Sequence, residues 1–185
     1  DGDTSYNQIK TDQVYSGTYS LFMDTHLSSA PYEQVYQEFD ISYTLADAHN
    51  FSAAVYPTLV GPTCGQAGVD QISLSINNTV TGVMHYMFYE WSGYTYPGGD
   101  IGVNVTSKVL YLLFDMIPNQ WNHLERDLLS DYSAFFGVPA NASELVILQI
   151  NLLAHSSNGD PGNFWIDDIK ITIEDDYTPP ITTTT

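Results

Sequence analysis

The sequence has very few basic residues and almost no cysteine. Lysine and arginine together number 4 against 22 aspartates and glutamates, which gives a formal net charge of −18 at pH 7. Binding to phosphate backbones or to anionic membranes requires clustered cations, so this composition excludes nucleic acid and anionic membranes as partners. The single cysteine, Cys64, rules out an intramolecular disulfide.

Long apolar runs and targeting signals are also missing. No apolar segment approaches the roughly 18 residues that a membrane-spanning helix needs, and we find no signal peptide. The first residues, DGDTSYNQ, are typical of an internal or processed start. Four N-x-S/T sequons agree with a secreted, extracellular protein, and they lie at Asn50, Asn77, Asn104 and Asn141.

The chain does contain enough apolar material for a folded domain. It has 185 residues, of which 43% are hydrophobic and 14% aromatic, and this length suits one domain with one core. Apolar and polar residues alternate with period two along most of the chain, which is typical of half-buried β-strands. Strands are therefore expected over residues 18–26, 33–43, 51–60, 70–78, 82–91, 108–116, 121–128, 144–155 and 164–173.

The pattern predicts an all-β fold, an antiparallel β-sandwich with one short helix. Only residues 128–136 (LLSDYSAFF) are typical of a helix, and there is no alternation of strands with helices. The last residues, YTPPITTTT, offer no core face and are typical of the start of a Thr/Pro-rich linker. We therefore expect one domain over residues 1–176 and a linker over residues 177–185 that joins it to other domains.

Three motifs occur in an order that resembles a known family. VYSGTYSLFM lies on an early strand, NQWNHLERDL lies two-thirds of the way along, and FWIDDIKIT closes the domain. Together they are similar to the β-jelly-roll carbohydrate-binding modules with a galactose-binding-domain-like fold, which are attached to many secreted hydrolases, lyases and proteases. The resemblance implies a jelly roll whose first and last strands lie side by side.

The resemblance also implies a structural Ca²⁺ ion that joins these two strands. Calcium takes about six to eight oxygen ligands, including backbone carbonyls. Asp167 matches the family's usual ligand position, with Asp168 next to it in the strand. The resemblance implies that Asp12 and the region of Ser16 supply the partners and that Asp1 or Asp3 completes the shell. Adjacent strand residues face opposite ways, so the alternative is that Asp167 and Asp168 face solvent at an edge.

Two places on such a fold are candidates for binding a sugar, because rings stack on sugar faces while amides and carboxylates bind hydroxyl groups. One is a sheet face formed by the polar sides of three strands, with Tyr36, Glu38, Asp40, Tyr111, Gln149 and Asn151. The other is a loop platform with Trp91, Tyr94 and Tyr96. The alternatives are ordinary exposed positions for the first set and rings that fold back onto the sandwich for the second. Trp121 is expected in the core.

The sequence contains no pattern for catalysis. The histidines show no H-E-x-x-H or H-x-H spacing, no G-x-S-x-G elbow occurs, and no pairing of carboxylates for glycoside hydrolysis is evident. We therefore expect a non-catalytic carbohydrate-binding module, monomeric within its multidomain chain, that targets an attached secreted enzyme to a neutral polysaccharide. The alternative is a calcium-stabilised structural domain of a surface layer, a filament or a secreted hydrolase.

Overall fold

The computed structural model describes residues 6–24, 33–58, 69–92, 101–104, 108–114, 116–156 and 163–173. Only the backbone is described for residues 6, 7, 33–40, 69, 92, 101–104, 111, 113, 155 and 156. The expected linker and the boundary near residue 176 lie outside this part of the chain.

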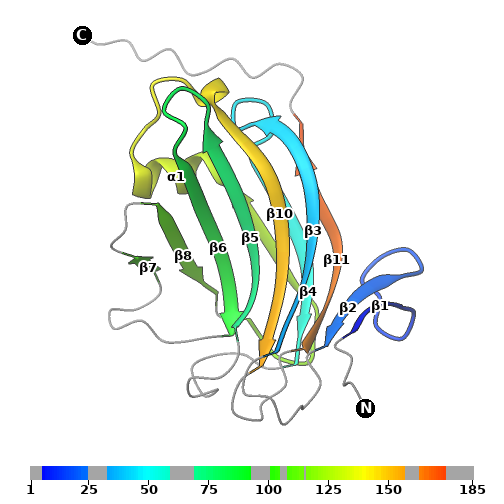
Figure 1. The fold of residues 1–185 in the computed structure, drawn as a ribbon. Helices are drawn as coiled ribbons and strands as arrows, with labels where there is room; N and C mark the ends of the chain where they lie inside the picture. Colours follow the sequence, from blue (N-terminus) through cyan, green and yellow to red (C-terminus); the bar gives the residue numbers. More distant parts are fainter. Residues whose placement is uncertain are drawn as a thin grey trace.

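Two β-sheets face each other (Figure 1). The five-stranded sheet has the order β1-β2-β11-β4-β9, formed by Tyr6–Lys10, Ser20–Asp24, Asn163–Thr172, Asn50–Pro57 and Asn122–Asp127. The six-stranded sheet has the order β3-β10-β5-β6-β8-β7, formed by Glu33–Thr44, Leu145–Ser156, Val69–Asn78, Met84–Ser92, Val109–Leu113 and Ile101–Asn104. This confirms the expected β-sandwich of jelly-roll type with one short helix.

The strands follow the period-two pattern of the sequence closely. Every expected strand is present, and β1 and β7 are two additional short strands at the sheet edges. Strands β6 and β8 run parallel, whereas the other paired strands are antiparallel. Strand β11 pairs with β2 over residues 163–166 and with β4 on its other side, so the opening and closing motifs lie side by side as expected.

Alternate residues of the strands build the core between the sheets. Val55 and Ile166 point inward from the five-stranded sheet and Leu74 from the six-stranded sheet, and each is 1% exposed or less. Trp91 on β6 is fully buried and packs edge-on against Phe164 on β11, with ring centroids 4.9 Å apart. This contact joins the two sheets through two of their largest fully buried side chains.

Helix α1, Leu128–Phe136, spans the expected range and lies beside β6, where Tyr132 contacts His85 (Figure 1). Asp127 begins the helix by accepting the backbone N–H of Ser130 at 2.9 Å. The buried carboxylate of Asp131 accepts the Tyr89 hydroxyl at 3.0 Å and the Arg126 Nε–H at 2.9 Å. These bonds fix the helix to the core. Within the described residues, no helix is long and apolar enough to cross a membrane.

Candidate functional site

Gln149 and Asn151, two of the residues expected on a sheet face, lie on the outer face of the six-stranded sheet, and the backbone register aligns Tyr36, Glu38, Asp40 and Tyr111 with them. Leu74 on β5 and Leu152 on β10 are fully buried, so the residues next to them in each strand face outward. The strand register forms one row with Glu38, Asn151, Ser73, Phe88 and Tyr111. A neighbouring row contains Asp40, Gln149, Ser75 and Tyr86, and a third contains Tyr36, Leu153, Gln71 and Glu90. Of Tyr36, Glu38, Asp40 and Tyr111 only the backbone position is described.

Two rings and several short polar side chains form the centre of this surface. We call it the polar face, and it consists of Ser73, Ser75, Tyr86, Phe88, Gln149 and Asn151. The rings of Tyr86 and Phe88 are stacked at 29° with centroids 6.5 Å apart, and Tyr86 is 37% exposed. Ser73 and Ser75 are each 6% exposed and lie on β5, between the rings of β6 and the amides of β10. An exposed ring therefore lies beside hydroxyl and amide groups, a combination suited to a sugar.

Asn151 carries an unsatisfied group on this face. Its side-chain oxygen is closed off from solvent and has no hydrogen-bond partner within the described part of the chain. Buried polar groups are nearly always hydrogen-bonded. The absence of a donor to this oxygen, which lies on the outer face and not in the core, therefore requires an explanation. A donor from a bound ligand is one such explanation.

Glu90 is a buried carboxylic acid on the same outer face. It is 4% exposed, and burial raises the pKa of its carboxyl group to about 7. Glycoside hydrolysis needs a second carboxylate within about 5–9.5 Å. Asp70, a second fully buried acid, lies on the neighbouring strand β5, where Gln71 pairs with Glu90 and the register shifts between Asp70 and Gln71.

The expected loop platform is not supported by its one described member. Trp91 lies inside strand β6 and is fully buried against Phe164. The expectation that Trp91 stacks on a sugar is therefore wrong, because the period-two pattern of β6 continues through Trp91 and turns it inward. Tyr94 and Tyr96 lie outside the described residues.

The two adjacent aspartates of the closing motif hold the loop that precedes β2. Asp167 Oδ2 accepts the backbone N–H groups of Tyr15 at 3.1 Å and Ser16 at 3.0 Å. Asp168 Oδ1 accepts the Ser16 hydroxyl at 2.7 Å, and its other oxygen lies 3.1 Å from the Lys170 ammonium. We call this arrangement the aspartate clamp: Asp167 and Asp168 with Tyr15 and Ser16.

A β-bulge explains how neighbouring strand residues reach the same loop. The register of β11 shifts between Asp167 and Lys170, and Asp168 has a φ of 50°, which is uncommon for a residue other than glycine. The hydrogen bond from Ser16, followed by that from Lys170, lowers the pKa of the Asp168 carboxyl below its ordinary value. The expectation that both aspartates simply face solvent does not account for these contacts.

The donors around the clamp do not fit the calcium site that the sequence led us to expect. Calcium needs oxygen ligands, whereas the loop turns amide N–H groups toward Asp167 and an ammonium group toward Asp168. Asp12 is exposed, and no cluster of three or more His, Cys, Asp or Glu side chains that could hold a metal occurs among the described residues. Asp1 and Asp3 lie outside them. In this arrangement, hydrogen bonds connect the loop before β2 to strand β11, the connection that was expected from the ion.

A second aromatic surface was missed by the sequence reasoning. It lies on the outer face of the five-stranded sheet, and we call it the aromatic strip: Phe22, Trp165, Tyr56, Trp121 and Tyr15. Register pairs Trp165 directly with Phe22 and with Tyr56. Trp121 is only half buried and lies against Tyr56 and Tyr15, so its expected place in the core is wrong. The outward position of Trp165 could have been inferred from the sequence, because Trp165 lies between Phe164 and Ile166, which face inward.

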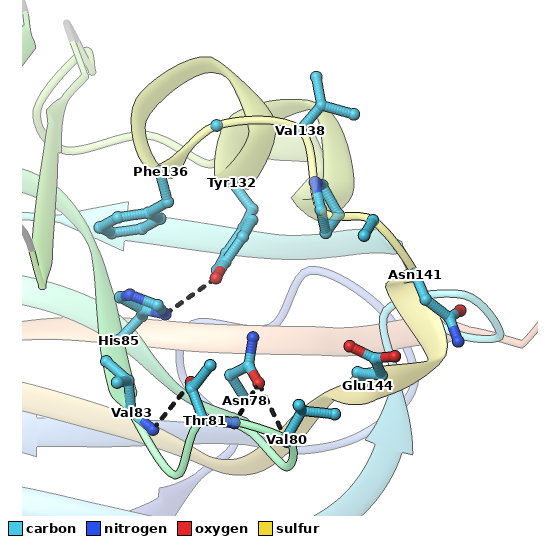
Figure 2. A pocket seen from close by; sticks show the side chains of 13 residues that line it. Asn78, Val80, Thr81, Val83, His85, Tyr132, Phe136, Val138, Asn141 and Glu144 are labelled. Carbon is cyan, nitrogen blue, oxygen red and sulfur yellow. Dashed lines mark hydrogen bonds between the residues drawn. The ribbon is translucent and has the colours of Figure 1, made fainter.

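A pocket at one end of the sandwich contains a histidine and a tyrosine that bind each other (Figure 2). It has a volume of about 390 Å³ and lies between the turn after β5 and the segment after α1. His85 Nδ1 and the Tyr132 hydroxyl are 2.9 Å apart, and burial lowers the pKa of His85. Asn78 Oδ1 accepts the N–H groups of Val80 and Thr81. These hydrogen bonds connect β6 to α1 and close the turn after β5.

The chain matches no protein-family model and no curated protein, but solved structures share its fold. The catalytic domain of Humicola grisea Cel12A in complex with a soaked thio cellotetraose is 14% identical and aligns over 92% of this chain and 87% of its own, with a TM-score of 0.57. A structure from a comparison of family 12 glycoside hydrolases is 11% identical over 88% and 85% of the two chains, with a TM-score of 0.52.

Carbohydrate-binding modules with a β-sandwich fold are also structural neighbours. One of them, described for the promiscuous specificity of carbohydrate-binding modules from the β-sandwich superfamily, is 8% identical over 91% of this chain, with a TM-score of 0.47. The present chain spans about half of that chain, 53%. At 14% and 11% identity, the likeness to the two glycoside hydrolase structures shows the fold alone, a β-sandwich.

Proposed function

We propose that this protein is a non-catalytic carbohydrate-binding module that binds a neutral polysaccharide on its polar face. The observation that carries the proposal is the exposed ring of Tyr86, stacked on Phe88 and bordered by the serines of β5 and the amides of β10. The ring supplies a stacking surface, and the serines and amides supply hydrogen-bond donors and acceptors.

The negative charge of the protein favours a neutral polysaccharide over an anionic one. With a net charge of −18 and only 4 basic residues, the protein repels uronate polymers and has few cations with which to pair their carboxylates. Neutral chains such as glucans, mannans and xylans meet no such barrier. The polar face itself offers uncharged groups, which suits a ligand without charge.

In finer terms, we place the domain in a secreted multidomain chain, where it holds an attached enzyme on its substrate. A single face of this size buries few ligand groups, so dissociation constants in the micromolar to millimolar range are expected. Avidity from the rest of the chain would then supply tight attachment. The galactose-binding-domain-like type remains part of this proposal through the opening and closing motifs.

Native gel electrophoresis through gels that contain a polysaccharide tests the proposal. Suitable gels contain barley β-glucan, galactomannan, arabinoxylan or soluble starch, with polygalacturonate as the charged control. We expect at least one neutral polymer to retard the protein, to nearly the same extent at low and high salt because stacking is not ionic. If no neutral polymer retards it, a structural domain of a surface layer, a filament or a hydrolase becomes the better account.

A further inference from the structure

We infer that the aromatic strip is a second glycan-binding surface, so that one domain holds two polysaccharide chains on opposite sides of the sandwich. The inference rests on the proposed carbohydrate binding and adds a site on the other sheet. It assigns the strip an extended segment of a neutral polysaccharide as its ligand.

The rings of the strip follow one another across the sheet from β2 to the start of β9. Centroid distances are 4.3 Å between Phe22 and Trp165, 5.5 Å between Trp165 and Tyr56, and 5.6 Å between Tyr56 and Trp121. The first four rings come from four adjacent segments, which at the usual strand spacing cover about 14 Å. A row of this length suits several sugar units in line and exceeds what a single sugar ring can cover.

Tyr15 extends the row and is its most exposed described member. It is 46% exposed, and its ring lies 5.6 Å from Trp121 and 6.5 Å from His123. The aspartate clamp holds its backbone over the sheet through the Tyr15 and Ser16 amides. The bulge and the left-handed conformation of Asp168 therefore position a stacking ring, which gives the unusual backbone a purpose.

Charge identifies a neutral partner for this surface. Two copies of a protein with a net charge of −18 repel each other, which disfavours a second copy. A cationic partner finds no free carboxylate in the clamp, because Asp167 is bound by amides and Asp168 by Ser16 and Lys170. Lys10 lies over the Phe22 ring at 5.5 Å, so this end of the strip also carries a cation. A neutral polymer with apolar sugar faces fits these conditions.

Trp165 adds a polar reason for a ligand. Its buried indole N–H has no acceptor among the residues that the structure describes. An unsatisfied donor of this kind is costly unless some group pairs with it. A sugar hydroxyl that reached this N–H would satisfy it.

Isothermal titration with cellohexaose, mannohexaose, xylohexaose and maltohexaose tests the inference. With the hexasaccharide that binds, we expect two sites per chain. Tyr15→Ala should weaken one of them by roughly three- to tenfold, the loss of one stacked ring, and Tyr86→Ala should weaken the other. Tyr19→Ala is the matched control, because Tyr19 lies in the same loop, is 61% exposed and has no ring contact with the strip among the described residues.

Oxidation of tryptophan by N-bromosuccinimide, mapped by mass spectrometry, gives a test that needs no variant. The hexasaccharide should slow oxidation of Trp121 and Trp165, while the buried Trp91 serves as an internal control. A single site that Tyr86→Ala removes, with no protection of Trp121 or Trp165, overturns the second surface and leaves the proposed function standing. A single site that only Tyr15→Ala weakens overturns both the two-chain arrangement and the polar face. Absence of any binding overturns both proposals.

Discussion

The Asp167 carboxylate accepts the backbone N–H of Ser16 at 3.0 Å, across 151 positions of sequence. This bond and its neighbours join the opening motif to the closing motif in a protein with no possible intramolecular disulfide. The same contacts place Tyr15 on Trp121 at the end of the aromatic strip. Stability and the shape of a candidate binding surface therefore depend on the same carboxylate.

Replacing Asp167 with alanine should release the loop while the sandwich stays folded. The change leaves three backbone N–H groups without their acceptor, those of Tyr15, Ser16 and Asp168. We expect a loss of about 1–3 kcal/mol in the free energy of unfolding, together with faster hydrogen exchange of the Tyr15 and Ser16 amides. Asp12→Ala is the control, because Asp12 is an exposed acid of the same loop. Equal effects of the two changes would show that the clamp contributes nothing.

Calcium should have little effect on the thermal stability of the protein. The clamp is closed by amide, hydroxyl and ammonium donors, which an ion would have to displace. We therefore expect the same melting temperature in EDTA and in added calcium, with no metal in native mass spectra. A calcium site would add about 2.7 kcal/mol to the free energy of unfolding at a free calcium concentration of 100 times its Kd. A rise of that size, abolished by Asp167→Ala, would restore the calcium site.

Glu90 should make stability depend on pH near neutrality. Its carboxyl pKa rises from an ordinary 4.5 to about 7 in the folded state because of burial, so the folded protein holds a proton that the unfolded chain has already lost. The contribution of Glu90 to the free energy of unfolding is then fully present below about pH 4.5 and decreases as the pH rises through about 7. The loss amounts to at most about 3 kcal/mol.

Chemical denaturation of the wild type and of Glu90→Gln at several pH values measures this effect. The variant keeps the shape of the acid and removes its charge, so its stability should change less than that of the wild type between about pH 5 and pH 8. Parallel stability curves for the two proteins would mean that Glu90 titrates at its ordinary value.

Trp91 should matter for stability and not for binding. Its ring is buried against Phe164, so Trp91→Phe removes core volume and should cost about 1–3 kcal/mol. The folded variant should bind a hexasaccharide as the wild type does. A loss of affinity without a loss of stability would return Trp91 to the binding surface.

The positions of the strands along the chain and the place of the helix could be predicted because both follow from local patterns. Alternation located β5 and β10, and the run from Leu128 to Phe136 located α1. The grouping of side chains on the faces of the sheets was harder to predict, since it depends on the register between strands that are distant in sequence. Trp165 contacts Tyr56 only because β11 pairs with β4. The role of Asp168 depends on a β-bulge, which breaks the alternation of side-chain directions, and no alternation pattern in the sequence reveals it. Trp91 was misplaced because glycines and tyrosines after it suggested an exposed loop, although its own parity already pointed inward.

Titration of Tyr86→Ala and Tyr43→Ala with the hexasaccharide that binds the wild type tests the central claim most directly. The two tyrosines have similar exposure, 37% and 43%, but Tyr43 lies with Ile171 and Ile173 at the apolar edge of the sandwich, away from the polar face. The account predicts that Tyr86→Ala weakens binding at the polar face by roughly three- to tenfold and that Tyr43→Ala leaves it unchanged. Equal affinities for the two variants and the wild type would contradict carbohydrate binding by the polar face.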